Sequence, residues 1–211
     1  MPERLDVKAC VFDAYGTLFD FASAARACVD VPEEAVERLT TLWRDKQLQY
    51  TWLRAAQGRH ADFLQVTADA LDFTLETLGL ERLGDRLLEL YLTLAAFPEV
   101  PEVLAKVRAA GLKTAILSNG TPAMLAAAVG AAGLTGQFDA VLSVEEVGAF
   151  KPDRRVYQLA VDRLGIPSTA IAFVSLNGWD AYAASAFGMR VVWCNRMASG
   201  PSGCPARRTA Q

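Results

Sequence analysis

The sequence has 211 residues, of which 52% are hydrophobic and 21% charged, and its formal net charge is −3. A chain of this length and apolar content can bury a sizeable core in at most two domains. The slight acidic excess, without a run of Lys or Arg, argues against nucleic acid or an anionic membrane surface as a partner. No uncharged apolar run approaches the roughly 18 residues that a membrane span requires.

The four cysteines are scattered along the chain without a CxxC pair: Cys10, Cys28, Cys194 and Cys204. This spacing lacks the density of a disulfide scaffold, so we expect free thiols in a reducing compartment. The first residues contain no long apolar segment behind basic residues, and no secretory signal is expected. The sequence therefore predicts a cytoplasmic protein that acts on small molecules.

Short apolar runs recur along the chain and show little alternation between apolar and polar residues. The first covers residues 7–12 and ends at Asp13, and similar runs follow at 113–117, 140–142, 171–174 and 191–193. Such runs are typical of strands that are buried on both faces of a parallel sheet.

Stretches with helical periodicity separate the later runs, at residues 99–110, 122–132, 153–164 and 179–187. A glycine lies at or just beyond the end of each stretch: Gly111, Gly133, Gly165 and Gly188. The alternation of strands and helices predicts an α/β protein with a Rossmann-like, doubly wound parallel sheet.

Residues 19–96 interrupt this alternation. Three segments, 33–54, 61–78 and 83–95, are helix-like, and no strand is evident between them. We therefore expect a discontinuous core domain of residues 1–18 and 97–197, with a helical cap domain of residues 19–96 inserted after the first strand. The cap would close over the carboxyl ends of the strands, where open α/β sheets bind ligands. Residues 198–211 are rich in Gly, Pro, Ser and basic residues, and we expect a flexible tail.

Polar clusters follow four of the predicted elements, at residues 13–17, at 118–121, at Lys151 and at 175–180. Each cluster alone fits an ordinary turn, a surface charge or a helix start. Because parallel strands end at the same edge of a sheet, the four clusters are expected to form one site.

The segments that carry these clusters are FDAYGTLFD, ILSNGTP, FKPDRRVYQLA and FVSLNGWDA. Together they resemble the haloacid dehalogenase superfamily and, more narrowly, its L-2-haloacid dehalogenases. The segment LWRDKQLQYTWLR within the cap is also typical of that subgroup. The resemblance covers residues 5–196 and implies hydrolysis of short (S)-2-haloalkanoic acids to (R)-2-hydroxy acids. It implies an aspartyl-ester intermediate, no metal or cofactor, and a homodimer.

Asp13 is the predicted nucleophile. A carboxylate with a reference pKa of about 3.9 is ionised at neutral pH and needs no general base. The superfamily's phosphatases carry a second aspartate two residues after the nucleophile, where this sequence has Tyr15. A halide leaving group needs no proton, so Tyr15 favours carbon–halogen cleavage over phosphoryl transfer. Packing against the cap is the alternative role for the Tyr15 side chain.

The resemblance also implies the residues that hold the substrate. Ser118 would bind the substrate carboxylate together with backbone N–H groups near Ala14 and Tyr15, although a Ser-Asn-Gly sequence also suits a plain turn. Arg44 of the cap would receive the halide with Asn119 and Trp179. A solvated surface charge is the alternative for Arg44. The next residue, Asp45, is acidic where related enzymes carry a neutral polar side chain.

The hydrolytic residues implied by the resemblance centre on Lys151 and Asp180. Lys151 would keep the nucleophile ionised, and Asp180 would orient Lys151 or activate water. The sequence does not decide which group takes the proton from water. The other implied members of this network are Thr17, Tyr157, Ser175 and Asn177. For Tyr157, which lies six residues after Lys151, core packing is a serious alternative.

Several other functions fit the same residues less well. A fluoroacetate dehalogenase or a strained-ring hydrolase would use the same nucleophile in a pocket of different size. A phosphatase would need the missing second aspartate, and a non-catalytic relative would bind a carboxylate or a protein partner. With His60 as its single histidine, the chain does not suit a His-based zinc site, and no Gly-rich dinucleotide motif follows the first strand.

Overall fold

A computed structural model of the chain describes residues 6–196. Its strands are β1 (Ala9–Phe12), β2 (Lys113–Ser118), β3 (Ala140–Ser143), β4 (Ile171–Ser175) and β5 (Arg190–Trp193). Its α-helices are α1 (Ser23–Ala27), α2 (Glu33–Ala56), α3 (Phe63–Leu78), α4 (Gly84–Leu92), α5 (Val100–Ala109), α6 (Pro122–Ala131), α7 (Arg154–Leu164) and α8 (Gly178–Phe187). Three short 3-10 helices complete the order: η1 (Glu81–Leu83), η2 (Val144–Glu146) and η3 (Ser168–Ala170).

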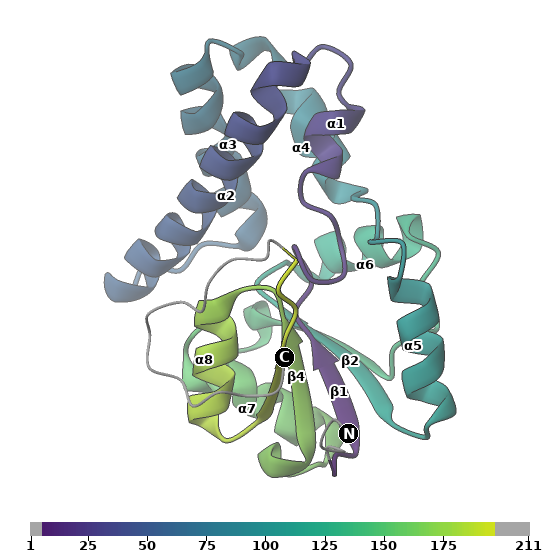
Figure 1. The fold of residues 1–211 in the computed structure, drawn as a ribbon. Helices are drawn as coiled ribbons and strands as arrows, with labels where there is room; N and C mark the ends of the chain where they lie inside the picture. The colour runs from purple at the N-terminus through teal and green to yellow at the C-terminus, as the bar shows by residue number, and fades with distance from the viewer. Residues whose placement is uncertain (1–5, 197–211) are drawn as a thin grey trace.

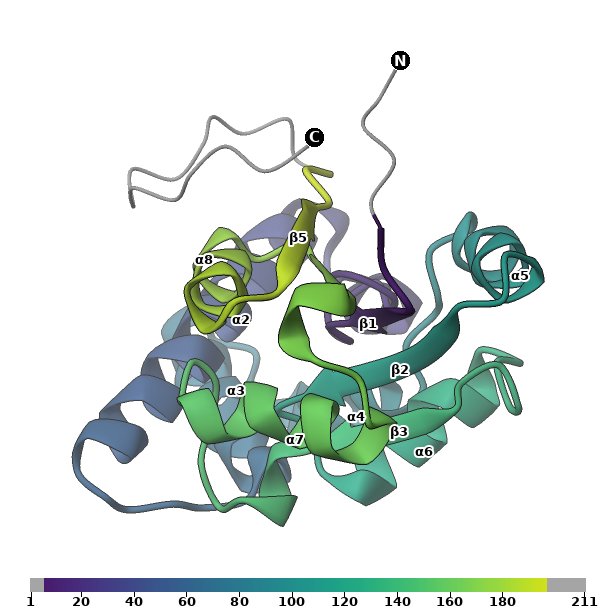
Figure 2. The same ribbon diagram turned by 90° about the horizontal axis from the view of Figure 1, so that it is seen from below.

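The five strands form one parallel sheet in the order β3-β2-β1-β4-β5. The chain winds outward from β1 through β2 to β3 and then returns to β4 on the other side of β1. Helices α5 and α6 cover one face of the sheet, and α7 and α8 cover the other (Figures 1 and 2). The predicted doubly wound α/β fold is therefore confirmed.

Burial on both faces explains why the strands are apolar throughout. All four residues of β1 are buried, and β2 is buried from Thr114 to Ser118. The helices that cover the sheet begin and end at the expected signals. Thr121 caps the start of α6 by accepting a hydrogen bond from Met124 N at 3.2 Å, and Gly165 ends α7 in the left-handed conformation.

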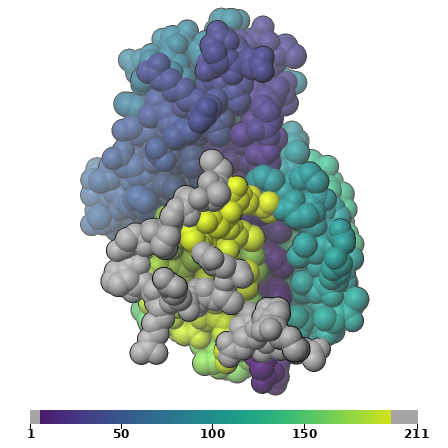
Figure 3. Space-filling view, viewed as in Figure 1, coloured from purple at the N-terminus to yellow at the C-terminus, as the bar shows by residue number. Residues whose placement is uncertain are grey.

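The segment from α1 to α4 is entirely helical and lies above the carboxyl ends of the strands (Figure 1). Its atoms, coloured purple to blue in Figure 3, meet those of the sheet and its covering helices directly. This arrangement confirms the predicted helical cap inserted after the first strand. The short helix α1 was not predicted, because five residues are too few to show a helical period.

The chain passes between the sheet and the cap twice, and the two passages lie side by side. Phe19 and Ala96 form an isolated antiparallel bridge. Two backbone hydrogen bonds flank it, from Phe97 N to Leu18 O at 3.0 Å and from Asp20 N to Ala95 O at 2.8 Å. The bridge lies at the predicted boundaries of the cap, 19 and 96, but the division into two domains stays a prediction.

Two sequence-based expectations lie partly or wholly outside the described residues: the flexible tail 198–211 and the state of Cys204. The other three cysteines, Cys10, Cys28 and Cys194, are free thiols. Within residues 6–196, no helix is both long and apolar enough to cross a membrane.

Candidate active site

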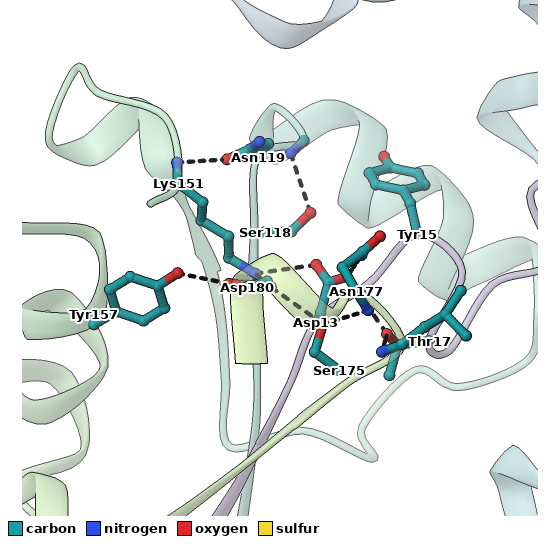
Figure 4. Close-up of polar contacts among 12 residues, drawn as sticks. Asp13, Tyr15, Thr17, Ser118, Asn119, Lys151, Tyr157, Ser175, Asn177 and Asp180 are labelled. Carbon is teal, nitrogen blue, oxygen red and sulfur yellow. Dashed lines mark hydrogen bonds and ion pairs between the residues drawn. The ribbon is translucent and has the colours of Figure 1, made fainter. Parts of the chain in front are cut away.

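Asp13 lies directly after β1, at the centre of the carboxyl edge of the sheet. Its side chain is 8% exposed. Lys151 Nζ donates to Oδ1 at 3.0 Å, and Asn177 Nδ2 donates to Oδ2 at 2.9 Å (Figure 4). Thr17 Oγ1 donates a longer bond to Oδ2 at 3.4 Å while accepting from Leu176 N at 2.9 Å. Donors from three separate segments therefore fix the orientation of this carboxylate.

The loop after Asp13 turns sharply so that Thr17 can reach back to the carboxylate. The carbonyl of Ala14 accepts hydrogen bonds from the N–H groups of Thr17, Leu18 and Phe19. Gly16 has a φ of +88°, and a Cβ there would lie 2.9 Å from Leu176 Cδ2, so only glycine fits. Within the described chain, the N–H groups of Ala14 and Tyr15 donate to no other backbone group.

Lys151 lies between two carboxylates in the interior. Its side chain is 1% exposed, and Nζ also donates to Asp180 Oδ2 at 2.7 Å. Burial by itself lowers the pKa of Lys151, but the charges of Asp13 and Asp180 outweigh burial and raise the pKa above its usual 10.5. The side chain therefore stays an ammonium at neutral pH.

Asp180, in the first turn of α8, is fully buried and accepts three hydrogen bonds. Tyr157 of α7 donates to Oδ1 at 2.7 Å, and Ser175 at the end of β4 donates to Oδ2 at 3.3 Å, besides the bond from Lys151 (Figure 4). Burial, followed by the nearby charge of Asp13, raises the pKa of Asp180 although Lys151 opposes the shift. The same burial and the charge of Asp180 raise the pKa of Tyr157, so its hydroxyl keeps its proton and remains a donor.

The residues after β2 lie beside this network. Asn119 Oδ1 accepts from Lys151 N at 3.0 Å, which ties the loop before α7 to the end of β2. Ser118 Oγ accepts from Gly120 N at 3.1 Å. Ser118 and Asn119 are both buried. Among the described residues, the Oγ–H group of Ser118 and the Nδ2 group of Asn119 donate to no other group, so both can donate to a ligand.

Tyr15 packs against the cap. Its ring stacks on Tyr91 of α4 with 5.3 Å between centroids and lies 5.8 Å from the ring of Phe63 on α3. Burial raises the pKa of Tyr15 well above 10, so the hydroxyl stays neutral at physiological pH. Tyr15, two positions after Asp13, therefore forms an apolar wall of the candidate site with one neutral hydroxyl.

Arg44 and Trp179 come from the two sides of the cap–sheet junction. Arg44 lies on α2 and extends toward the loop after β1. Its Nη2 is 3.5 Å from the carbonyl oxygen of Tyr15. Trp179 packs edge-on against Trp52 of α2, and its Nε1 is buried with no hydrogen-bond partner among the described residues. An unsatisfied buried N–H is rare and is expected where a ligand accepts the bond. Asp45, beside Arg44, is exposed.

The structure thus joins eight of the predicted residues by direct hydrogen bonds: Asp13, Thr17, Asn119, Lys151, Tyr157, Ser175, Asn177 and Asp180. The other five, Ala14, Tyr15, Arg44, Ser118 and Trp179, lie around this network and donate nothing to it. Tyr157 donates to Asp180, and its ring also packs in the core against Phe173 and Phe187. The roles of all thirteen residues stay predictions.

Two residues of the site's surroundings were not predicted. Gln47 is a fully buried glutamine on α2 that contacts Arg44. The sequence feature that could have revealed Gln47 is its position on the helix face shared with Trp43 and Thr51, where an amide side chain is unusual. Arg196 lies after β5 and donates to Thr17 O at 2.9 Å, a contact between residues so distant in sequence that no local pattern indicates it.

Comparison with known proteins places this chain in one family. The family model of haloacid dehalogenase-like hydrolases matches residues 7–188. The chain therefore belongs to the haloacid dehalogenase-like hydrolases.

The similar proteins are more specific. The chain is 47% identical over 194 residues to (S)-2-haloacid dehalogenase 1 of Pseudomonas sp. (strain CBS-3), covering 90% of this chain and 86% of that protein. A dehalogenase crystal structure superimposes with a TM-score of 0.90 at 43% identity, covering 93% of this chain and 88% of the other. The structure of L-2-haloacid dehalogenase from Xanthobacter autotrophicus with chloropropionic acid covalently bound gives a TM-score of 0.81 at 48% identity, covering 88% and 76%.

Proposed function

We propose that this protein is an (S)-2-haloacid dehalogenase that converts short (S)-2-haloalkanoic acids to (R)-2-hydroxy acids through an ester of Asp13. The observation that carries the proposal is the Asp13 carboxylate, held by Lys151 and Asn177 beneath the cap arginine, with Tyr15 in place of a second aspartate. The identity of 47% to an (S)-2-haloacid dehalogenase supports the same activity.

In the first step, a carboxylate oxygen of Asp13 attacks Cα from the side opposite the carbon–halogen bond. A bond forms between that oxygen and Cα, and the halide leaves with the bonding electrons, so the configuration at Cα inverts. Holding the nucleophile and substrate at near-attack distance contributes about 7–11 kcal/mol to lowering the barrier. The relative with covalently bound chloropropionic acid supports an ester intermediate of this kind.

The substrate is held at two ends. Ser118 Oγ and the backbone N–H groups of Ala14 and Tyr15 receive its carboxylate. Arg44, Asn119 and Trp179 Nε1 receive the halide as its negative charge develops, which is when preorganised donors stabilise the transition state. The buried N–H of Trp179, which has no partner among residues 6–196, supports this assignment.

In the second step, water attacks the carboxyl carbon of the Asp13 ester and releases the 2-hydroxy acid. Whichever oxygen of Asp13 carries the ester, the other becomes the carbonyl oxygen and keeps its own donor, Lys151 at Oδ1 or Asn177 at Oδ2. The bond between the carboxyl carbon and the ester oxygen breaks, the 2-hydroxy acid leaves with one proton from the water, and the Asp13 carboxyl group is restored. Asp180 accepts hydrogen bonds from Lys151, Tyr157 and Ser175, which supports a role in fixing Lys151 and orienting the water. We propose that residues 19–96, as a cap domain, exclude bulk water until the halide has left.

The source of the product oxygen tests the ester directly. In a single turnover in ¹⁸O-labelled water, the hydroxyl of the product should carry unlabelled oxygen, because it comes from Asp13. The substitution Asp13→Asn should abolish halide release under the conditions in which the wild type releases halide. Label in the product hydroxyl during the first turnover would mean that water attacks Cα itself and would contradict the ester mechanism.

The substrate range separates the proposal from its alternatives. Halide release is expected from chloroacetate and (S)-2-chloropropionate and not from the (R) enantiomer. Preference for fluoroacetate would indicate a defluorinating hydrolase, and magnesium-dependent release from p-nitrophenyl phosphate would indicate a phosphatase. No halide release from any of these acids would point to a binding protein.

We further propose a cytoplasmic location and a homodimer. The three free thiols among the described residues support a reducing compartment. Light scattering coupled to size-exclusion chromatography would measure the mass in solution, and a mass of one chain would contradict the dimer.

A further inference from the structure

The cap arginine is held by a neutral group. Arg44 Nη1 donates to Gln47 Oε1 at 2.6 Å, one helical turn along α2. Nη2 lies near a second neutral oxygen, the carbonyl of Tyr15, and the guanidinium carbon is 5.5 Å from the centre of the Phe21 ring. Within residues 6–196, Arg44 forms no ion pair with a carboxylate. Its positive charge is therefore fixed in place without being neutralised.

The carboxamide of Gln47 can face Arg44 in only one orientation. Its Nε2 donates to Thr67 Oγ1 at 2.7 Å and to Tyr91 Oη at 3.1 Å, so both amide hydrogens are used. Thr67 gives its own proton to Phe63 O at 2.6 Å and must accept from Gln47. Since the amide nitrogen is committed on that side, the oxygen has to point toward the guanidinium.

This network joins three cap helices. Gln47 lies on α2, Thr67 on α3 and Tyr91 on α4, and all three side chains are 0 to 1% exposed. Trp43 of α2 adds a bond from Nε1 to Thr67 O at 2.9 Å. The same Tyr91 ring stacks on Tyr15 beside the nucleophile. The position of the arginine is thus tied to the packing of the whole cap and to the wall of the site.

From this geometry we infer that Gln47 is a positioning residue, which holds the Arg44 guanidinium over the site with its charge free to receive the departing halide. A glutamate at this position would have nearly the same shape but would pair with Arg44 and cancel the charge that an anion needs. A hydrophobic residue would pack but would release the arginine. The inference rests on the proposed function, because it assumes that Arg44 receives the halide.

The experiment compares two leaving groups in single-turnover halide release. Chloride is a poorer leaving group than bromide, so its departure depends more strongly on the arginine. Gln47→Leu should lower the rate with (S)-2-chloropropionate by about 10- to 100-fold, as misplacement of a reacting or stabilising group does. The rate with (S)-2-bromopropionate should fall less, so the bromide-to-chloride ratio rises. Arg44→Ala should raise the same ratio.

Two further variants separate positioning from folding. Gln49→Leu makes the same substitution on the exposed side of α2 and should leave both rates at the wild-type value. Tyr91→Phe keeps the ring that stacks on Tyr15 and removes only one acceptor of the Gln47 amide. It should raise the bromide-to-chloride ratio in the same direction by a smaller factor, and it decides the question if Gln47→Leu does not fold.

Equal losses with both substrates in Gln47→Leu and Tyr91→Phe would assign Gln47 a purely structural role and overturn the inference. If Arg44→Ala released halide more slowly while Gln47→Leu kept wild-type rates, the inference would be overturned and the proposed function would stand. Wild-type rates in Arg44→Ala would remove the halide role of the arginine itself, and the inference would fail with it.

Discussion

At the scale of single residues, the site is governed by one ammonium and two buried carboxylates. Lys151 donates to Asp13 and Asp180, and none of the three side chains is more than 8% exposed. Because the pKa of Lys151 is raised, its charge and the stability that depends on it persist below its usual pKa of 10.5. They are lost only as the pH rises through the still higher value in the folded state.

Lys151→Met should therefore destabilise the protein in a way that depends on pH. Removing one partner of a buried ion pair costs about 3–5 kcal/mol at neutral pH. Burial already raises the pKa of Asp180, and the loss of Lys151 raises it further, so the folded variant takes up protons before the unfolded one. Its stability relative to the wild type should recover as the pH falls from about 7 to about 5. Urea denaturation at both pH values measures this difference.

Lys106→Met is the matched control. Lys106 forms an exposed i,i+4 pair with Glu102 on α5, and such pairs contribute at most about 0.5 kcal/mol. Its loss should be small at both pH values. A deficit of Lys151→Met that stays constant or grows on acidification would show that the buried carboxylates are not the cause.

At the scale of elements, the carboxyl ends of the strands and the loops that follow them build the site. The order of the sheet places Asp13, after β1, between the ends of β2 and β4. Ser118 ends β2, and Ser175 ends β4. The parallel register therefore brings together residues that are more than a hundred positions apart in sequence.

This is why much of the site could be predicted from the sequence. Apolar runs predicted all five strands, and the polar clusters after them predicted where Asp13 and its donors would meet. Contacts made by side chains across the cap could not be predicted, since they depend on how α2, α3 and α4 pack. Gln47 looks like one more polar residue of a long helix until Thr67 and Tyr91 are placed beside it.

Gly120→Ala tests the close approach between the loop after β2 and Tyr15. A Cβ at this position would lie 2.8 Å from Tyr15 Oη and 2.9 Å from Cε2. The ring cannot retreat freely, because Tyr91 and Phe63 pack against it. We expect a loss of stability of about 1–3 kcal/mol from overpacking and a lower kcat/KM, both measured on the purified variant.

Gly130→Ala on α6 makes the same substitution where a Cβ meets nothing within 4 Å. A helical glycine replaced by alanine should gain about 0.5–1 kcal/mol without a change in kcat/KM. If the two variants showed the same changes in stability and kcat/KM, the contact with Tyr15 would not be what excludes a side chain at position 120.

At the scale of the whole molecule, the junction between sheet and cap is closed by a residue from the far end of the described chain. Arg196 donates to Thr17 O at 2.9 Å and pairs with Glu99. Its guanidinium carbon lies 3.8 Å from the centre of the Phe97 ring. One side chain thus holds both segments by which the chain passes between the sheet and the cap.

Arg196→Ala should loosen this junction. We expect faster hydrogen exchange at the amides of Asp20 and Phe97, whose bonds join the two passages, and a higher KM, because the cap and the loop of Asp13 lose a shared support. Arg190→Ala is the control, since the one side-chain bond of Arg190 to the described residues 6–196 is to Thr169 O at the edge of the sheet. Unchanged exchange at Asp20 and Phe97 in Arg196→Ala would count against this account.

The bridge between Phe19 and Ala96 has a consequence for how such a protein can change. A segment that leaves and re-enters a fold at adjacent points can be lengthened, shortened or exchanged while the host keeps its own strand order. Asp13, its donors and Tyr15 belong to the host, whereas Arg44 and the rings of Phe63 and Tyr91 that pack against Tyr15 belong to the inserted segment. Under the proposed function, one contiguous replacement of this segment would change the arginine and the rings behind Tyr15 while leaving Asp13 and its donors in place.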